Sequence, residues 1–147
     1  NVDAVSLSKL LSQLGAKSLI KAMNKIFKGD ASFQEQNHKE ATYAKKISKE
    51  EAKINWNQSA KIVLAKINGL NPNPGAWFNY KNERYKIWKA KIINTSGNPG
   101  TTVDEMLTVA CAEQSIKILE IQKEGKSRQQ TDQFLLGNKI KIDESID

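Results

Sequence analysis

A polar stretch near the start of the sequence divides the chain and limits what it can fold into. Residues 34–40 read Gln-Glu-Gln-Asn-His-Lys-Glu, and the region between residues 31 and 53 is almost wholly polar. Such a segment buries too little apolar surface to form a core or to cover a neighbouring helix. We therefore interpret residues 31–50 as a basic, extended linker between two bodies.

An amphipathic helix is predicted before the linker. Apolar residues recur at spacings of three and four positions with lysines between them, and Gly29 follows as a C-terminal cap. The apolar stripe of such a helix must lie on a protein surface, and the polar linker offers none. We therefore expect residues 1–30 to be the last helix of a domain whose remainder is missing, and a start at Asn1 agrees with a fragment. The stripe consists of Leu7, Leu10, Leu11, Leu14, Leu19, Ile20, Met23, Ile26 and Phe27.

A β-rich body is predicted over residues 51–147. Its first helix ends before the turn Asn71-Pro72-Asn73-Pro74-Gly75, which neither a helix nor a central strand could cross. Four or five short antiparallel strands with flanking helices fit a small open β-barrel of the OB type, and they are too few for a β-sandwich. The fold class is therefore mainly β with flanking helices. The expected strands are 76–80, 84–92, 106–111 and 115–122, and Thr131 is expected to cap a last helix.

Two finer expectations concern single segments of this body. Alternation along residues 84–92 places Trp88 and Ala90 on one side and Ile87 on the other, as in a half-buried edge strand. The acidic residues 143–147 are expected to fray.

Positive charge is concentrated in the first two-thirds of the sequence. The net charge is +7, and residues 1–50 hold nine Lys or Arg against five acidic residues, while residues 51–100 hold eight against two. Residues 101–128 hold four against five, and residues 129–147 hold two against four. A segregated excess favours an anionic partner, which we interpret as nucleic acid. The alternative is a solvated, lysine-rich face.

Ten basic residues are the candidates for contacts with nucleic acid. Four lie at the end of the linker and at the entry to the second body, where flexible ammonium groups can meet phosphates without reading bases. Four more lie on the strand at 84–92, and two lie in a turn at 123–128, for which plain solvation is the alternative. The ten are Lys45, Lys46, Lys49, Lys53, Arg84, Lys86, Lys89, Lys91, Lys126 and Arg128.

Aromatic residues are interleaved with the basic residues of the first hairpin. Alternating basic and aromatic residues on an OB-like strand pair are typical of surfaces that bind single strands. For Trp77 and Trp88, however, the large area of the indole favours packing in the core, and the same holds for Trp56.

No catalytic constellation is found in the sequence, which lacks the motifs of phosphate-binding loops, nucleophile elbows and zinc-binding helices. His38 is the only histidine, which excludes a multi-histidine metal site, and its polar setting predicts a solvated side chain. Cys111 is the only cysteine, is expected to be buried in a strand, and fits a reducing cytoplasm. We predict no catalytic, cofactor-binding or metal-binding residue here, and no membrane span.

A series of motifs resembles the methionyl-tRNA formyltransferase family over essentially the whole chain. The turn Asn71-Pro72-Asn73-Pro74-Gly75-Ala76-Trp77 is similar to a turn of that family, with Asn73 where Trp is usual. The helix around Leu14-Gly15-Ala16 resembles the last helix of the family's formyltransferase domain. The other matching segments, in order, are 42–51, 54–56, 59–60, 86–90, 99–101, 119–122, 125–128 and 134–137.

The resemblance implies a bacterial, cytoplasmic transferase that moves a formyl group from 10-formyltetrahydrofolate to the amino group of methionyl initiator tRNA. Residues 1–30 would end the formyltransferase domain, residues 31–50 would be the linker, and residues 51–147 would be an OB-like tRNA-binding domain. The family's catalytic Asn, His and Asp and its folate-contacting loop have no counterpart in this sequence, and His38 does not match them.

The same resemblance sets the expected partners. They are initiator methionyl-tRNA and the missing N-terminal catalytic domain. The protein is expected to be a monomer. This fragment should bind no cofactor and should be inactive alone. Two alternatives stay open. One is the C-terminal domain of another folate-linked formyltransferase or a formyltetrahydrofolate hydrolase, and the other is a non-catalytic OB-type nucleic-acid-binding module.

Overall fold

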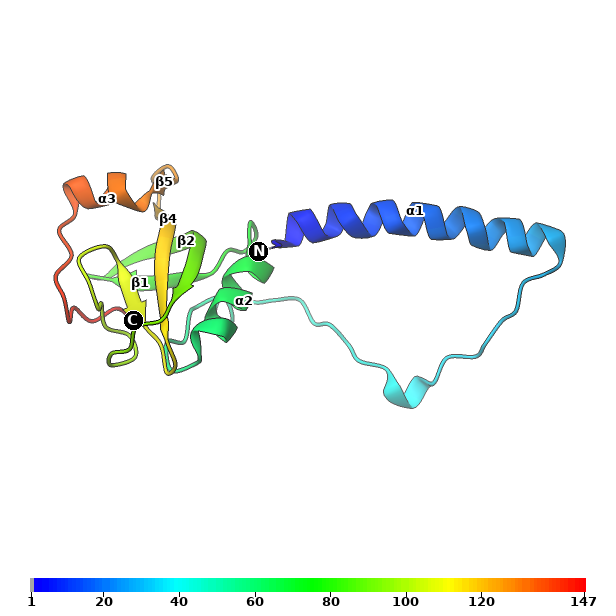
Figure 1. Ribbon diagram of the computed structural model, residues 1–147, viewed down its shortest axis with the longest axis horizontal. Helices are drawn as coiled ribbons and strands as arrows, with labels where there is room; N and C mark the ends of the chain where they lie inside the picture. Colours follow the sequence, from blue (N-terminus) through cyan, green and yellow to red (C-terminus); the bar gives the residue numbers. More distant parts are fainter. Residues whose placement is uncertain (1) are drawn as a thin grey trace. The chain divides into compact units, whose positions relative to one another are not determined.

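The structure is a computed structural model that describes residues 2–147, and the chain divides into two units. The smaller unit, Val5–Lys46, contains most of helix α1 (Ala4–Lys28) and the following extended segment, in which η1 (His38–Glu40) is a single 3₁₀ turn (Figure 1). As predicted, Gly29 caps α1 with a φ of +76°. The amide of Gly29 donates to Ile26 and the amide of Asp30 to Lys25, which is the Schellman arrangement.

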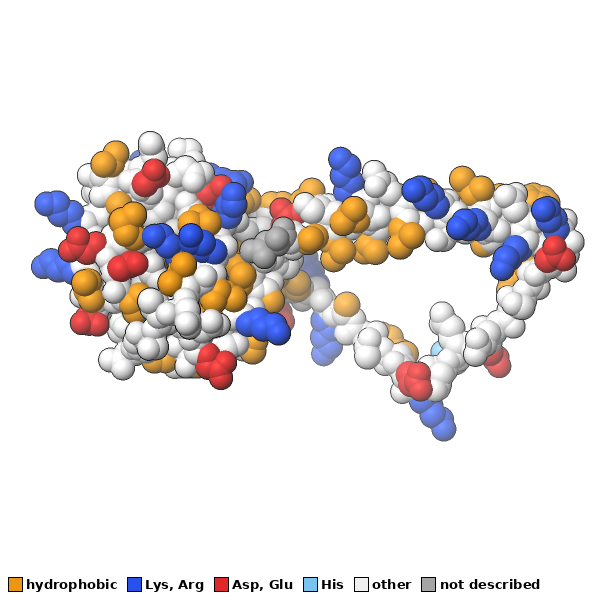
Figure 2. All heavy atoms as spheres, viewed as in Figure 1, with side chains coloured by type: hydrophobic (Ala, Val, Ile, Leu, Met, Phe, Trp, Pro, Cys, Tyr) orange, Lys and Arg blue, Asp and Glu red, His pale blue; other side chains and the backbone are white. Residues whose placement is uncertain are grey.

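The apolar stripe of α1 is exposed along its length. No residue described in this helix is buried, and Leu14 and Phe27 are 61% and 82% exposed. Figure 2 shows apolar side chains of α1 at the surface with lysines between them. Within the described residues, no helix is long and apolar enough to cross a membrane.

The larger unit, Ile47–Asp147, is a curled antiparallel sheet with short helices (Figure 1). The strand order is β1-β2-β4-β3, and β5 pairs with β4 on the edge that β3 also occupies. The mainly β, OB-like architecture is therefore confirmed. The elements are α2 (Ala60–Leu70), β1 (Trp77–Tyr80), β2 (Glu83–Ile93), β3 (Thr108–Ala110), β4 (Ser115–Lys123), β5 (Gln129–Gln130) and α3 (Thr131–Gly137).

The core lies between the inner face of the sheet and helix α2. Phe78 stacks on Tyr85 at 5.7 Å between ring centroids, and Trp56, at 5% exposure, meets the edge of Phe78 at 6.1 Å. Trp56 is thus the core residue that its size predicted. Val63 and Ile67 of α2 are fully buried because the helix presents one apolar face to the sheet.

A β-bulge in β2 corrects the predicted alternation. Tyr85, Ile87 and Ala90 are all buried, so the inward face shifts by one position within the strand. The register against β4 shifts between Ile87 and Ala90, so Trp88 stays on the outward face with Arg84 and Lys86 while Ala90 turns inward. The buried side chain of Asn71 donates to the carbonyls of Ile87 and Trp88 at 3.4 and 2.9 Å. The edge assignment was also wrong, because β2 lies between β1 and β4.

The expectation that residues 143–147 fray was wrong. Ile146 is 2% exposed, and its amide donates to the carbonyl of Gly100 at 2.7 Å. The backbone of Asp147 exchanges hydrogen bonds with Asn79 of β1. A side chain at Gly100, where φ is +80°, would meet the carbonyl oxygen of Ile146 at 3.1 Å, so the glycine permits this close approach. The segment thus spans the gap between β1 and residues 100–102.

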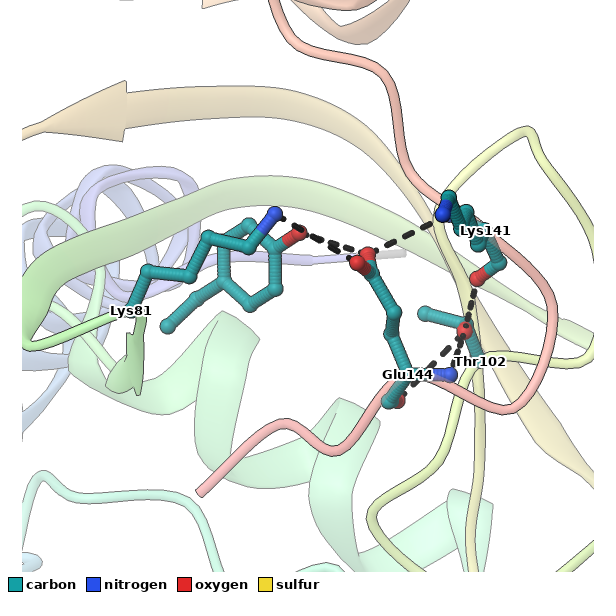
Figure 3. A network of polar contacts seen from close by, with 5 residues as sticks. Lys81, Thr102, Lys141 and Glu144 are labelled. Atoms are coloured by element: carbon teal, nitrogen blue, oxygen red, sulfur yellow. Dashed lines mark hydrogen bonds and ion pairs between the residues drawn. The ribbon is translucent and has the colours of Figure 1, made fainter.

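Glu144 fixes the same segment through its side chain (Figure 3). Its carboxylate accepts a hydrogen bond from the Tyr80 hydroxyl at 2.5 Å and pairs with Lys81 at 3.4 Å. The Thr102 hydroxyl donates to the carbonyl of Lys141 at 2.6 Å and accepts from the Glu144 amide at 3.0 Å. The hydrogen bond from Tyr80 lowers the pKa of the Glu144 carboxyl. The acidic composition of residues 143–147 predicted a frayed, solvated end. The partners that hold it come from distant parts of the chain, which composition does not show.

Candidate nucleic-acid interface

The outer face of β1, β2 and β4 gathers basic and aromatic side chains. Trp77 on β1 pairs in register with Lys86 on β2, and Lys86 pairs with Gln122 on β4. Arg84 and Lys86 are both half-buried and share this face, because they alternate with the buried Tyr85 and Ile87. Trp88, two residues after Lys86, lies on the same face. We call Trp77, Arg84, Lys86, Trp88, Gln122 and Arg128 the basic-aromatic face.

The core packing predicted for Trp77 and Trp88 holds only in part. Both rings are half-buried, and Trp77 packs against the edge of the core, whereas Trp88 is not part of it. Ring size alone could not place them, because a half-buried indole that packs under an arginine also hides much of its area. The signal that could have placed Trp77 is its alternation with the buried Phe78 along β1.

Trp77 joins the end of the linker to the sheet. Its indole Nε1 donates to the carbonyl of Lys49 at 2.8 Å. Its backbone amide donates to Ala52, and its carbonyl accepts from Ile54, so residues 52–54 run beside β1. Lys49 and Lys53 are therefore held at the edge of the basic-aromatic face rather than on a free linker.

The Trp77 indole also holds an arginine. The guanidinium carbon of Arg84 lies 4.2 Å from the centroid of the ring, within the range of a stacked cation–π contact. The edge of the same guanidinium faces Glu124 across 3.8 Å.

Trp88 carries a second arginine in the same manner. The guanidinium carbon of Arg128 lies 4.9 Å from the ring centroid. The Trp88 indole donates to Gln122 Oε1 at 2.8 Å, and Gln122 Nε2 donates to the carbonyl of Lys126 at 2.7 Å. This chain of hydrogen bonds fixes the turn that precedes Arg128.

Glu120 holds the edge of Arg128. The carboxylate is only 10% exposed, and both Nε and one terminal nitrogen of the guanidinium reach its Oε2. Burial acts to raise the pKa of the Glu120 carboxyl, but hydrogen bonds from Arg128 and Gln130 outweigh it, and the pKa lies below its ordinary value. Glu120 is therefore an anion that holds the guanidinium of Arg128 in position.

A hollow of about 300 Å³ lies beside Trp77. Its wall combines the cationic groups of Lys49, Arg84 and Lys86, which outnumber the single carboxylate of Glu124, with the ring of Pro74 and the indole. Gly75, with a φ of +83°, lets the Lys86 side chain lie across the turn, because a Cβ there would meet Lys86 Cδ at 3.2 Å. The hollow suits a ligand that is both anionic and planar.

The structure brings together only part of the predicted residue set. Lys49, Arg84 and Lys86 surround the hollow, and Arg128 covers Trp88 on the same face. Lys53 turns to Asp147, whose carboxylate lies 3.1 Å from its Nζ. The remaining candidates are exposed, with Lys89 and Lys91 on β2, Lys126 in the turn before β5, and Lys45 and Lys46 in the smaller unit.

The groups considered for catalysis are not among the residues of the basic-aromatic face. His38 is exposed in η1, and Cys111 is buried, which raises the pKa of its thiol to about 11 and disfavours the thiolate. In residues 2–147, no three His, Cys, Asp or Glu side chains gather in a way that could hold a metal ion.

Fold and face together define a small, basic, OB-like domain that follows a long amphipathic helix. Residues 46–139 match a protein-family model that is described as the formyl transferase C-terminal domain. The chain belongs to this family, which confirms the resemblance seen in the sequence.

Curated relatives carry the same name as the family that the motifs resemble. A methionyl-tRNA formyltransferase from Pelagibacter ubique is 45% identical over 139 residues, which cover 94% of this chain and 45% of the relative. Another from Bradyrhizobium diazoefficiens is 42% identical over 144 residues, covering 95% of this chain and 46% of the relative. The chain therefore spans slightly less than half the length of these relatives.

Solved structures share the fold at low sequence identity. A variant of HypX from Aquifex aeolicus aligns with a TM-score of 0.66 and 18% identity, covering 91% of this chain and 26% of HypX. HypX in complex with tetrahydrofolic acid aligns with a TM-score of 0.60 and 18% identity, covering 81% of this chain and 22% of HypX.

Proposed function

We propose that this chain is the C-terminal part of a methionyl-tRNA formyltransferase and that its larger unit holds initiator tRNA. The observation that carries the proposal is the basic-aromatic face on a domain whose curated relatives are enzymes named for a tRNA substrate. The reaction itself, formyl transfer from 10-formyltetrahydrofolate to the methionyl amino group, belongs to the N-terminal catalytic domain of the parent protein. We assign no folate-binding residue to this chain.

In this proposal, the lysines supply the attraction to phosphates. Lys86, Lys91 and Lys126 form no ion pair within the described residues, so their charges are available to an anion. Lys49 is equally unpaired there, and its backbone is tied to Trp77. Flexible ammonium groups bind phosphates as point charges, which gives affinity and register without reading bases. The remote contacts would position the amino group in the active site.

The two units have different roles in this assignment. Helix α1 would pack on the catalytic domain through its exposed apolar stripe, and residues 31–50 would connect that domain to the tRNA-binding unit. Lys45, Lys46, Lys49 and Lys53 would then lie along tRNA between the two domains. Burial of the stripe by the missing domain would explain why a 25-residue helix exposes all of its large apolar side chains.

The test is a titration of initiator tRNA with this chain at about 50 and 200 mM salt. About five phosphate contacts predict that affinity falls roughly 100-fold or more between these concentrations. Lys86→Gln combined with Lys91→Gln should reduce the slope of log affinity against log salt by about 1.5 to 2. Lys61→Gln combined with Lys139→Gln removes the same charge from other exposed sites and is the control. A salt-insensitive interaction, or equal effects of both pairs, would contradict the proposal.

A further inference from the structure

The two arginines of the basic-aromatic face are held in the same way. The flat side of each guanidinium lies on an indole, Arg84 on Trp77 at 4.2 Å and Arg128 on Trp88 at 4.9 Å. The edge of each faces a carboxylate, Glu124 for Arg84 and Glu120 for Arg128. The two pairs come from different parts of the chain, since Arg84 lies on β2 and Arg128 follows β4.

This geometry makes Arg128 a poor ligand for phosphate and weakens Arg84 as one. A guanidinium binds phosphate through the N–H groups on its edge. The edge of Arg128 is hydrogen-bonded to the nearly buried Glu120, whereas Arg84 faces the exposed Glu124 across 3.8 Å, beyond hydrogen-bond distance. The side chains of Arg84 and Arg128 are 36% and 50% exposed, so both stay accessible to a ligand. The plane of an arginine is one of the surfaces on which unpaired RNA bases stack.

Lys86 lies between the two arginine–indole pairs. It is the register partner of Trp77 and lies two residues before Trp88, and it forms no ion pair within the described residues. The face therefore alternates a stacking plane, a free cation and a second stacking plane. A single strand has the matching order of base, phosphate and base, whereas the bases of a duplex are already stacked on each other.

We propose that this face binds unpaired RNA nucleotides, with one base stacked on Arg84, another on Arg128, and the intervening backbone phosphate on Lys86. The inference rests on the proposed tRNA-binding function and sharpens it. Unpaired nucleotides would dock on the basic-aromatic face, while paired regions would contact only the lysines. Glu120 and Gln122 are positioning residues, because they orient Arg128 and Trp88 without touching the RNA.

A third cation–π pair serves as an internal comparison. Lys81 lies 4.6 Å from the ring centroid of Tyr80, but an ammonium has no plane on which a base could stack. Lys81 also pairs with Glu144. Removing its charge is therefore expected to leave the preference for single-stranded over abasic RNA unchanged.

The experiment compares three probes at one salt concentration with the whole chain. They are a 12-nucleotide single-stranded RNA, a 12-mer of the same backbone without bases, and a duplex with the same number of phosphates. The single strand should bind tightest, by at least about fivefold per stacked base. Arg84→Lys and Arg128→Lys keep the charge and lose the plane, so each should lower affinity for the single strand about fivefold or more. Affinity for the abasic strand and the slope against salt should not change.

Three outcomes are decisive. Equal binding of single-stranded and abasic probes, or arginine variants that weaken both alike, would overturn the stacking role and leave only electrostatics. Lys81→Gln is the control, and a loss of the preference for single-stranded over abasic RNA equal to that caused by Arg128→Lys would also overturn the stacking role. Failure of the proposed tRNA-binding function would give a different result, because the unaltered chain would then show no salt-dependent binding of initiator tRNA. Unchanged thermal midpoints of the arginine variants would exclude unfolding as the cause.

Discussion

Helix α1 and the β-rich unit contain similar apolar residues, but these side chains are exposed in α1 and buried in the β-rich unit. In the larger unit, Phe78, Ile87 and Ile121 are almost completely buried. In α1, the leucines and isoleucines of the stripe are about half exposed, and Phe27 is 82% exposed. The sequence pattern of α1 is nevertheless regular enough for a helix of 25 residues with a complete C-terminal cap. A good helix pattern and a buried helix are therefore separate properties, and only the larger unit supplies a core of its own.

The difference also concerns where the partners of each side chain lie in the sequence. Contacts within α1 are local, at three or four residues' spacing. The core of the larger unit joins distant segments, for example Trp56 to Phe78 and Tyr85 to Phe134. Stability of the larger unit should thus respond strongly to single substitutions, and stability of α1 within this chain should respond weakly.

The largest difference is expected between Trp56→Ala and Phe27→Ala. Trp56 is 5% exposed in the core, so its truncation should cost about 3–5 kcal/mol of unfolding free energy. Phe27→Ala removes a ring that touches little and should change the unfolding free energy by less than about 0.5 kcal/mol. Urea unfolding followed by circular dichroism measures both. Similar losses for the two variants would show that α1 shares the cooperative core.

An intermediate effect is expected at alkaline pH. Burial, and then the Glu83 carboxylate that accepts from its hydroxyl, raises the pKa of Tyr85 to about 12 from an ordinary value of 10.0. Because the folded-state pKa is raised, its contribution to stability is complete below pH 10 and is lost as the pH rises toward 12. The loss should be on the order of 2 kcal/mol.

Two tyrosine variants locate this alkaline loss. Tyr85→Phe should flatten the decline in unfolding free energy between pH 10 and 12. Tyr43→Phe alters a ring that is 90% exposed in the extended segment and should leave the decline unchanged. A decline of the same size in both variants would assign it to other groups. Tyr80 is one such group, since burial, and then Glu144, raises its pKa as well.

The order of the elements was predictable because it depends on local pattern and turn chemistry. The helix cap at Gly29, the turn at 71–75 and Asn82 of the hairpin turn follow from residue types that tolerate those backbone angles, whereas Lys81 adopts a φ of +51° that its type does not favour. The bulge in β2 was not predictable, because its carbonyls depend on Asn71, which is sixteen residues away from Ile87. The prediction that residues 143–147 fray failed for the same reason, since composition cannot show that Gly100 and Asn79 lie within hydrogen-bond reach of residues 146 and 147.

The candidate site was predictable in its charges but not in its geometry. All four predicted basic residues of β2 are on the larger unit, yet the sequence did not distinguish the ion-paired Arg84 from the unpaired Lys86. That distinction depends on Glu124, forty residues later. The roles of Trp77 and Trp88 could not be predicted either. The sequence shows only that a tryptophan is present, and it does not show whether the ring lies in the core or under an arginine at the surface.

The smallest effect in this chain should come from the apolar stripe itself. Leu11→Ser combined with Leu14→Ser changes two side chains that are 56% and 61% exposed, and should alter the unfolding free energy of the larger unit by less than about 0.5 kcal/mol. In the parent protein, where we propose that the stripe is covered, the same pair should cost about 2 kcal/mol or more, because buried leucines are replaced by polar side chains. Thermal unfolding of both proteins measures the difference. Ser8→Ala with Ser12→Ala, on the same helix but outside the stripe, is the control, and an equally small effect of the leucine pair in the parent would show that α1 is not packed there.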